Sequence, residues 1–352
     1  MAYTTINKST DYFNTKLYTG TGSSNAITGV GFQPDWVWIK QRNETRAHSI
    51  FDVVRGVQKQ LKSSDTDAQS TASSFLTAFG SDGFTYGGSD NGNKNGGSYV
   101  SWNWKAGGTG SANTSGSINS TVSVNTTAGF SIVKYTGTGS AGTVGHGLGV
   151  APKLIIVKCL DTAKAWTVYH SALGSSAAIF LEQTSAPTTS NTTYFNGTDP
   201  TSSVFSIGSS TNVTNSGDEF IAYCFAEKTG YSKFGSYTGN GNADGTFIYT
   251  GFKPEFVIFK KTNTTGNWAF IDSTRSYHNV GNHTLATNLT SAESAFGGGE
   301  SVDGASNRVD LVSNGIKIRD GSAYNNTNSG SYIYIAFGQS LVGSNNIPCT
   351  AR

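Results

Sequence analysis

Charged side chains are scarce in this sequence. They make up 13% of the 352 residues, and the formal net charge is +2. A chain that binds the phosphates of nucleic acid, or an anionic membrane surface, needs clustered lysines and arginines. No such cluster occurs in the sequence. We therefore expect neither nucleic acid nor a membrane as a partner.

Cysteines and long apolar runs are also few. Cys159, Cys224 and Cys349 lack the spacing of metal ligands, and an odd number leaves at least one thiol unpaired. This favours free thiols in a chain made in a reducing cell. No apolar stretch reaches the roughly 18 residues of a membrane span, and the first residues lack the regions of a signal peptide. We expect no membrane insertion and no export.

Glycine, in contrast, is abundant at 44 residues, and aromatic residues make up 12% of the chain. The aromatic content supplies the apolar surface that disordered chains lack. Short alternating runs lie between Gly, Asn and Ser turns, with Asp82-Gly83 and Asn314-Gly315 as hairpin signals, and no segment has a helical period. These patterns predict an all-β protein with antiparallel sheets.

The sequence contains three copies of one unit. The motif YTGTG at residues 18–22 recurs at 135–139 and, as YTGNG, at 237–241. Each copy continues with a proline-containing turn and an apolar strand that ends in lysine. Two kinds of anchor keep the same spacing, 118 residues from the first copy to the second and 102 to the third, which chance explains poorly. The anchors are Pro34, Pro152 and Pro254, and then Asp52, His170 and Asp272.

Repeats of this length are domains and not solenoid units. Because a sheet with an apolar face must cover it with another layer, we predict three tandem antiparallel β-sandwich repeats of jelly-roll or lectin-like type. The predicted parts are repeat 1 at residues 1–107, a Gly/Ser/Thr/Asn-rich connector at 108–129 with one edge strand at 121–124, repeat 2 at 130–229, repeat 3 at 230–342, and a C-terminal tail at 343–352.

The opening strand of each repeat is apolar on both faces. In the first copy Trp36 and Trp38 lie on one face, and Val37 and Ile39 on the other. At about 1.5–3 kcal/mol per buried large apolar side chain, leaving either face in water would forgo several kcal/mol. We predict that one face packs in the sandwich core. The other is covered by loops of the same repeat, a neighbouring repeat or another subunit, and its recurrence favours the last two.

The closing strand of each repeat alternates bulky apolar residues with smaller or polar ones. This alternation predicts core positions and not a ligand platform, the alternative for Trp102 and Trp104. The predicted repeat core comprises Trp36, Trp38, Trp102, Trp104, Leu154, Ile156, Tyr223, Phe225, Phe256, Ile258, Ile335 and Phe337.

Two copies share the pattern Asp-x-x-Arg, at Asp52 with Arg55 and at Asp272 with Arg275. The second copy has His170 and Leu173 at these positions. Because a repeated reactive group should recur in each copy, we interpret these residues as structural ion pairs that brace a turn, with a ligand-gripping arginine as the alternative.

Other signals of chemistry are weak. No localised acidic pair of a glycosidase is apparent, and YTGTG lacks the lysine and helix of a phosphate loop. His278 and His283 lie close in sequence, but a metal site is the less favoured interpretation. We expect no catalytic residues, no cofactor, no metal and no enzyme activity, and the sequence names no ligand-binding residues.

The combined motifs resemble repeat-containing virion structural proteins of marine tailed bacteriophages, tail-fibre-like proteins that carry a domain of unknown function. The resemblance extends from about Tyr12 to Leu341 and implies a particle component without supplying catalytic residues. The chain lacks the heptads and low-complexity shaft of a long fibre, which favours a compact appendage or capsid-surface protein. The runs that carry the resemblance include GFQPDWVWIK, SYVSWNWKAGG, GHGLGVAPKLIIVK and GYSKFGSYTGNGNADGTFIYTGFKPEFVIFK.

The resulting functional hypothesis is a structural protein on the surface of a tailed-phage virion that adheres to host-surface glycans through its loops. It would be assembled in the host cytoplasm, contact other virion proteins, and occur as a homo-oligomer or in repeated copies. The alternatives are a capsid decoration protein with a mechanical role and a particle-bound polysaccharide depolymerase.

Overall fold

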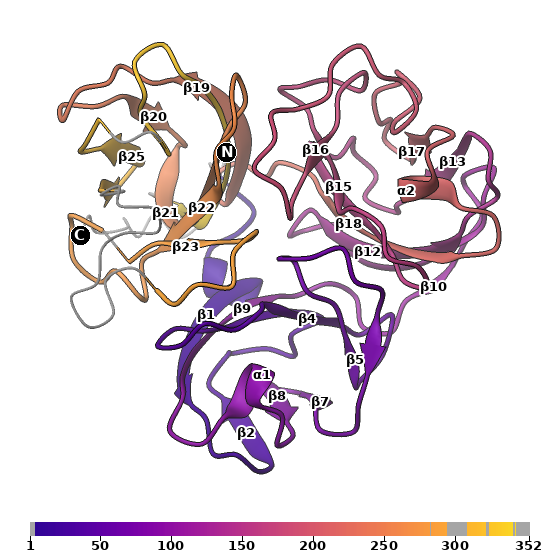
Figure 1. Cartoon of the computed structure of the whole chain (residues 1–352), viewed down its shortest axis with the longest axis horizontal. Coiled ribbons are helices and arrows are strands. Elements are labelled where there is room, and N and C mark those ends of the chain that lie inside the picture. The colour runs from indigo at the N-terminus through magenta and orange to yellow at the C-terminus, as the bar shows by residue number, and fades with distance from the viewer. Residues whose placement is uncertain (1–3, 282, 294–307, 322–323, 341, 343–352) are drawn as a thin grey trace.

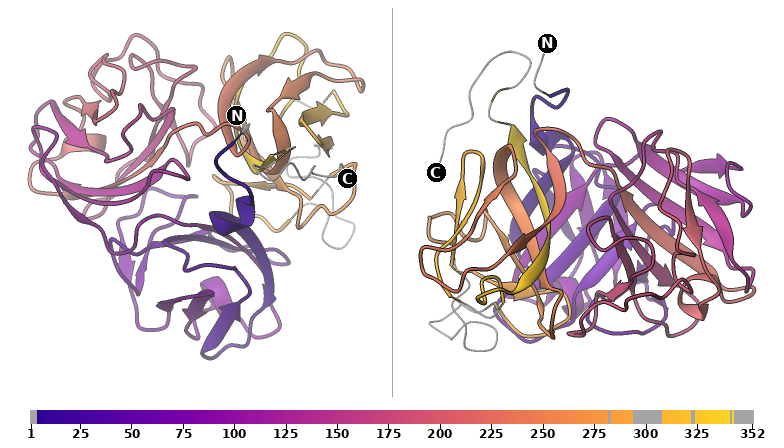
Figure 2. Two further views of the ribbon diagram at one scale, coloured as in Figure 1. Left: turned by 180° about the vertical axis from the view of Figure 1, so that it is seen from behind. Right: turned by 90° about the horizontal axis from the view of Figure 1, so that it is seen from above.

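The computed structural model describes residues 4–281, 283–293, 308–321, 324–340 and 342. Strands dominate, and the helices there are single short turns, which confirms the predicted all-β class. The strands form three lobes around a common centre (Figure 1), and the view from behind shows the same arrangement (Figure 2). We call them lobe 1 (residues 13–104), lobe 2 (111–225) and lobe 3 (232–340).

Lobe 1 has a large and a small antiparallel sheet. The large sheet has the order β1 (Phe13–Thr19), β9 (Ser98–Trp104), β3 (Trp36–Gln41) and β4 (Ser49–Asp52). The small sheet has the order β2 (Asn25–Thr28), β8 (Gly83–Tyr86) and β7 (Leu76–Gly80). The short elements β5 (Lys59–Gln60), β6 (Ser70–Thr71) and α1 (Asp90–Asn93) complete the lobe, and η1 (Ser9–Asp11) precedes it.

Lobe 2 repeats this plan with a wider large sheet. Its order is β10 (Ser111–Asn113), β11 (Ser120–Asn125), β12 (Phe130–Thr136), β18 (Glu219–Phe225), β14 (Leu154–Cys159), β15 (Thr167–His170) and β16 (Ile179–Phe180). The small sheet pairs β13 (Gly142–Gly145) with β17 (Val204–Ile207), and α2 (Thr211–Thr214) precedes β18.

The stretch predicted as a connector is part of lobe 2, because β10 and β11 extend its large sheet. The predicted edge strand at 121–124 lies within β11, and β10 covers it. Val122 is buried in the apolar cluster of lobe 2 and Val124 packs against that cluster. The alternation of these valines outweighs the Gly- and Ser-rich composition around them.

Lobe 3 follows the plan of lobe 1. Its large sheet has the order β19 (Ser232–Thr238), β26 (Ser331–Ser340), β21 (Phe252–Lys261), β22 (Trp268–Asp272) and β23 (Leu285–Ala286). Its small sheet has the order β20 (Phe247–Tyr249), β25 (Gly315–Ile318) and β24 (Val309–Val312). The hairpins expected at Asp82-Gly83 and Asn314-Gly315 join β7 to β8 and β24 to β25. The predicted tail at 343–352, with Cys349, lies outside the described residues.

The two faces of the opening strand have different partners. In lobe 1 Val37 and Ile39 pack against the small sheet, where they join a cluster with Ile27 of β2 and Phe84 of β8. The opposite face, with Trp36 and Trp38, belongs to an apolar cluster that all three lobes share. The sequence left three possible covers for this face: loops of the same repeat, a neighbouring repeat or another subunit. In the structure the neighbouring repeats cover it.

The shared cluster is the central core of the molecule. All twelve residues of the predicted repeat core belong to it and are at most 4% exposed, so Trp102 and Trp104 are not accessible as a ligand platform. Aromatic rings join each lobe to the other two. The ring pairs are Trp36 with Tyr223 (centroids 4.6 Å apart), Trp104 with Phe256 (5.6 Å) and Phe225 with Phe337 (5.5 Å).

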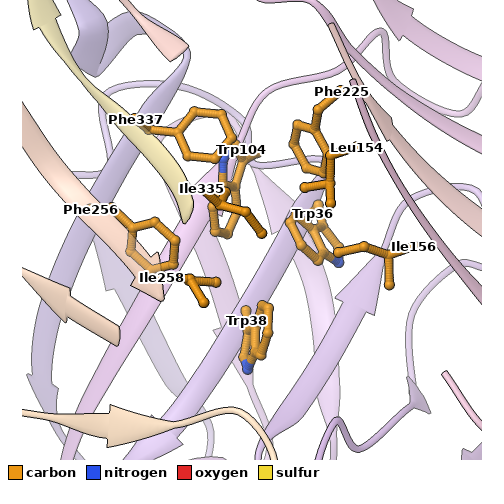
Figure 3. Close-up of a pocket in the computed structure, with 10 residues that line it drawn as sticks. All are labelled: Trp36, Trp38, Trp104, Leu154, Ile156, Phe225, Phe256, Ile258, Ile335 and Phe337. Carbon is orange, nitrogen blue, oxygen red and sulfur yellow. The ribbon is translucent and has the colours of Figure 1, made fainter. Parts of the chain in front are cut away.

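A cavity of about 10 Å³ remains in the central core. Ten of the core residues surround it, all drawn in Figure 3, and they come from all three lobes. This volume is at the lower limit for one water molecule, and an apolar lining gives water no partners. The centre is therefore a packed junction.

Because the three lobes share one core, we expect them to unfold in a single cooperative transition. Trp36→Ala should lower the free energy of unfolding by roughly 3–5 kcal/mol through lost burial and the cavity left behind. Tyr249→Ala, at a tyrosine that is 54% exposed, should change it by less than about 0.5 kcal/mol. Calorimetry and denaturant titration measure both effects, and three separate transitions would contradict the shared core.

Candidate functional site

The two Asp-x-x-Arg patterns form buried ion pairs. Arg55 Nε donates to Asp52 Oδ2 at 2.5 Å, and the backbone N–H of Arg55 donates to the other carboxylate oxygen at 2.9 Å. Arg275 and Asp272 make the same two bonds, at 2.5 Å and 2.8 Å. Each pair holds the turn that follows β4 or β22.

The carboxylates of these pairs also join lobes. The Tyr223 hydroxyl in lobe 2 donates to Asp52 Oδ2 at 2.8 Å, and Trp102 Nε1 in lobe 1 donates to Asp272 Oδ2 at 3.0 Å. Both donors occupy the same register position of the closing strand. A buried carboxylate therefore accepts a hydrogen bond across two of the three lobe interfaces.

The interface between lobes 2 and 3 has a different hydrogen bond. This difference explains why His170 replaces aspartate there. Lobe 3 places Ile335 at the donor position, so it offers no side-chain hydrogen bond there. His170 Nε2 instead lies 3.2 Å from the backbone oxygen of Tyr334. Burial lowers the pKa of His170 to about 4, so the ring is neutral near pH 7 and needs no counter-ion. Leu173 accordingly stands where the other lobes have arginine.

A second set of contacts runs around the interfaces. In each lobe one ring N–H donates a hydrogen bond to a backbone carbonyl of another lobe. The donor residue lies next to β4 in lobe 1, next to β15 in lobe 2 and in β22 in lobe 3. In lobe 1 Trp38 Nε1 donates to His48 Nδ1 at 2.9 Å, so the proton of the neutral imidazole is on Nε2. The three contacts are His48 Nε2 with Ala286 O (3.0 Å), Trp166 Nε1 with Lys62 O (2.8 Å) and Trp268 Nε1 with Phe180 O (2.8 Å).

One lysine near the end of each of β3, β14 and β21 is fully buried, namely Lys40, Lys158 and Lys260. The Lys158 ammonium donates to Thr66 O in lobe 1 at 3.0 Å, and the Lys260 ammonium donates to Thr184 O in lobe 2 at 2.8 Å. Burial lowers the pKa of both lysines to about 8, and that of Lys40 to about 7. Sequence reasoning noticed these lysines but gave them no role.

The YTGTG motif also has a structural explanation. Tyr18 stacks on Tyr99, with ring centroids 5.2 Å apart, and its hydroxyl donates to Gly92 O at 2.7 Å. A Cβ on Gly20 would lie 2.2 Å from the backbone oxygen of Lys94, so glycine is required for this close approach. The motif therefore anchors the end of β1.

One segment of lobe 3 departs from the repeat. We compare the length of the connection that follows β4 in lobe 1, β15 in lobe 2 and β22 in lobe 3. In lobe 1, Ile50 of β4 pairs with Leu61, eleven residues later. Val168 with Ile179 in lobe 2 has the same separation. In lobe 3 the corresponding residues, Phe270 and Leu285, are fifteen apart. The four additional residues lie between β22 and β23, and we call the described part of this segment, residues 273–281 and 283–284, the insertion.

The insertion borders a cavity of about 170 Å³. Tyr277 is 66% exposed, and its ring centroid lies 4.0 Å from that of His278. Val280 is 41% exposed. The cavity is lined by Arg275, Ser276, Tyr277, His278, Val280 and His283, and we call it the lobe 3 pocket.

Glu293 connects the floor of this pocket to lobe 1. Its buried carboxylate accepts from Arg275 Nη1 at 3.0 Å and from Arg42 Nε at 2.6 Å, and one of its oxygens lies 3.2 Å from His283 Nδ1. Arg275 thus faces two carboxylates, Asp272 and Glu293. The two arginines and two carboxylates balance in formal charge.

Backbone pairing holds the insertion in place. The side-chain amide of Asn279 donates to Leu311 O at 3.3 Å, and its oxygen accepts from the Leu311 N–H at 3.1 Å. Gly281 and Val309 exchange two backbone hydrogen bonds at 2.8 Å and 3.1 Å. These bonds attach the insertion to the edge of β24 in lobe 3.

The lobe 3 pocket was missed from the sequence, although a signal existed. The aspartate anchors of repeats 1 and 3 are 220 residues apart, but Leu61 and Leu285 are 224 apart. His278 and His283, considered earlier as a metal pair, both line the pocket. No group of three His, Cys, Asp or Glu suited to a metal ion occurs among the described residues. Within them, no helix is long and apolar enough to cross a bilayer.

Comparison with known families identifies one match. The family described as "Domain of unknown function (DUF7483)" matches residues 8–340. The chain belongs to this family. No curated protein and no solved structure matches it.

Removing one carboxylate tests the interface bonds. Asp52→Ala leaves the buried charge of Arg55 without its counter-ion and the buried hydroxyl of Tyr223 without its acceptor, so the free energy of unfolding should fall by roughly 3–5 kcal/mol. The double variant Asp52→Ala/Arg55→Leu, which removes the uncompensated charge as Leu173 does in lobe 2, should recover part of this loss. A urea titration that finds the double variant less stable than Asp52→Ala would contradict this account.

The buried histidine predicts a pH dependence. The folded pKa of His170, about 4, lies below its ordinary value of 6.5, so the unfolded chain binds the proton more tightly between these values. Stability should therefore fall as the pH decreases from 6.5 to 4, by about 3 kcal/mol from this residue. His170→Gln, which keeps a donor for Tyr334 O, should show a smaller decrease in urea unfolding over this range. Parallel pH curves for the two proteins would exclude the effect.

Proposed function

We propose that this protein is a non-enzymatic structural component of the surface of a tailed-phage virion, where it adheres weakly to host-surface glycans through loops of lobe 3. The observation that carries the proposal is the contrast between the lobes. The inner apolar strand faces that recur in every lobe are buried in one central core, whereas the added residues of lobe 3 expose Tyr277 beside a pocket. A rigid support that presents a localised contact suits attachment.

We interpret the three lobes as tandem β-sandwich repeats of jelly-roll or lectin-like type, derived by triplication. In each lobe a small sheet packs on the outer face of a large one, and this two-layer packing supports the interpretation. The sequence resemblance to virion proteins supports a position on the particle. Assembly would take place in the host cytoplasm, with other virion proteins and further copies of the chain as partners.

The acidic residues at the lobe interfaces and beside the lobe 3 pocket favour binding over a depolymerase activity at these places. Hydrolysis of a polysaccharide requires two accessible carboxyl groups of different acidity. Asp52, Asp272 and Glu293 are instead buried, and each accepts charge-assisted bonds from arginine. These groups stabilise the lobes.

The proposal is tested on particles and on the purified chain. We expect cryo-EM of the intact virion to place the chain on its surface, and we expect the purified chain to bind host cells without releasing new reducing ends from host polysaccharide. Release that a single carboxylate substitution abolishes would replace the proposal with a depolymerase. Strict copy number on the head lattice without any cell binding would replace it with a mechanical decoration protein.

A further inference from the structure

We propose that the lobe 3 pocket binds one neutral sugar ring, with Tyr277 as its stacking surface. The inference deepens the proposed glycan adhesion and rests on it, since it names the site and the class of ligand. The insertion that forms the pocket has no counterpart in lobes 1 and 2, where the corresponding separations are both eleven residues.

The size of the pocket selects a ligand of one ring. Pockets for drug-sized molecules have volumes of roughly 300–1,000 Å³. The cavity here has about 170 Å³. A monosaccharide, or the terminal residue of a glycan whose remaining sugars extend into solvent, fits this space.

The lining combines an aromatic face with polar groups, which suits a sugar. A sugar ring presents C–H groups on its faces and hydroxyls at its edge, so it needs an apolar surface with hydrogen-bonding partners around it. Tyr277 and Val280 supply exposed apolar surface, and Tyr277 and His278 lie with their rings close together. His278 and His283 add ring nitrogens to the lining, and Nδ1 of His283 lies 3.2 Å from a Glu293 oxygen.

The charges beneath the pocket indicate a neutral ligand. An isolated buried arginine would favour a uronic acid or a sulfated sugar. Arg275, however, already pairs with Asp272 and Glu293, and Glu293 also pairs with Arg42. No positive charge of the floor is left uncompensated.

The site is also organised before binding. The bonds of Asn279 to Leu311 and of Gly281 to Val309 fix the insertion on the edge of β24. A fixed loop lowers the ordering cost that a weak ligand must offset. For one ring we expect a dissociation constant on the order of 1 mM, and repeated copies on a particle would raise the avidity.

The test is an NMR titration of the full chain with glucose, galactose, mannose and N-acetylglucosamine, and with glucuronate as the charged comparison. At least one neutral sugar should bind saturably, with little dependence on salt, and more tightly than glucuronate. Tyr277→Ala should weaken this binding at least tenfold, whereas Tyr277→Phe should retain it. Tyr249→Ala is the matched control, because this exposed tyrosine of lobe 3 lies on β20, outside the pocket.

Three results would overturn the inference: no saturable binding of any of the four neutral sugars, tighter and salt-dependent binding of glucuronate, or equal loss in Tyr277→Ala and Tyr249→Ala. The cell-binding assay separates this inference from the proposed function. Cell binding that Tyr277→Ala leaves unchanged removes only the pocket as the site. If Tyr277 is required for sugar binding but the chain is absent from the virion, the proposed function is wrong and the sugar site remains supported.

Discussion

The structure depends on the burial of three sheet faces against one another. Each large sheet is apolar on both faces, but its own lobe has only one small sheet to cover it. The inner face would therefore be exposed to water in an isolated lobe. Closing three such faces around a centre removes all of them from water together, which is the largest favourable term available to this chain. The cavity of about 10 Å³ shows how completely the side chains fill that centre. Aromatic residues do most of this filling, because few other side chains cover so much area.

Polar contacts then fix how the lobes meet. Apolar packing is not directional, but a buried donor left without an acceptor is costly, so each interface accepts only matched orientations. Tyr223 on Asp52, Trp102 on Asp272 and His170 on the Tyr334 carbonyl occupy equivalent places. The ring nitrogens of His48, Trp166 and Trp268 add a second matched set. In this second set each lobe donates one hydrogen bond to a neighbouring lobe and accepts one from the other. The three lobes therefore form a closed ring of head-to-tail contacts.

Much of this architecture follows from the sequence. The repeat spacing located the three units, and the alternation in strands such as β9 identified the core, because a strand places every second side chain on the same face. The apolar face of Trp36 and Trp38 required a cover. Which surface covers it depends on contacts between residues more than a hundred positions apart, and periodicity contains no such information. The strand predicted at 121–124 lies within β11, but β10 and the place of both strands in the large sheet of lobe 2 were missed for a related reason: they depend on neighbours in the sheet and not on composition.

The lobe 3 pocket was harder to foresee, since its residues have no pattern of their own and become a site only where the insertion meets β24 and Glu293. The interfaces also determine how the lobes are ordered around the centre. Three identical lobes, each with an indole or phenol donor and an aspartate acceptor, would fit such a ring in any order. The lobes of this chain do not have identical donors and acceptors. Ile335 beside an aspartate would leave the carboxylate without a hydrogen-bond donor from the neighbouring lobe, so these side chains allow only one circular order of the lobes.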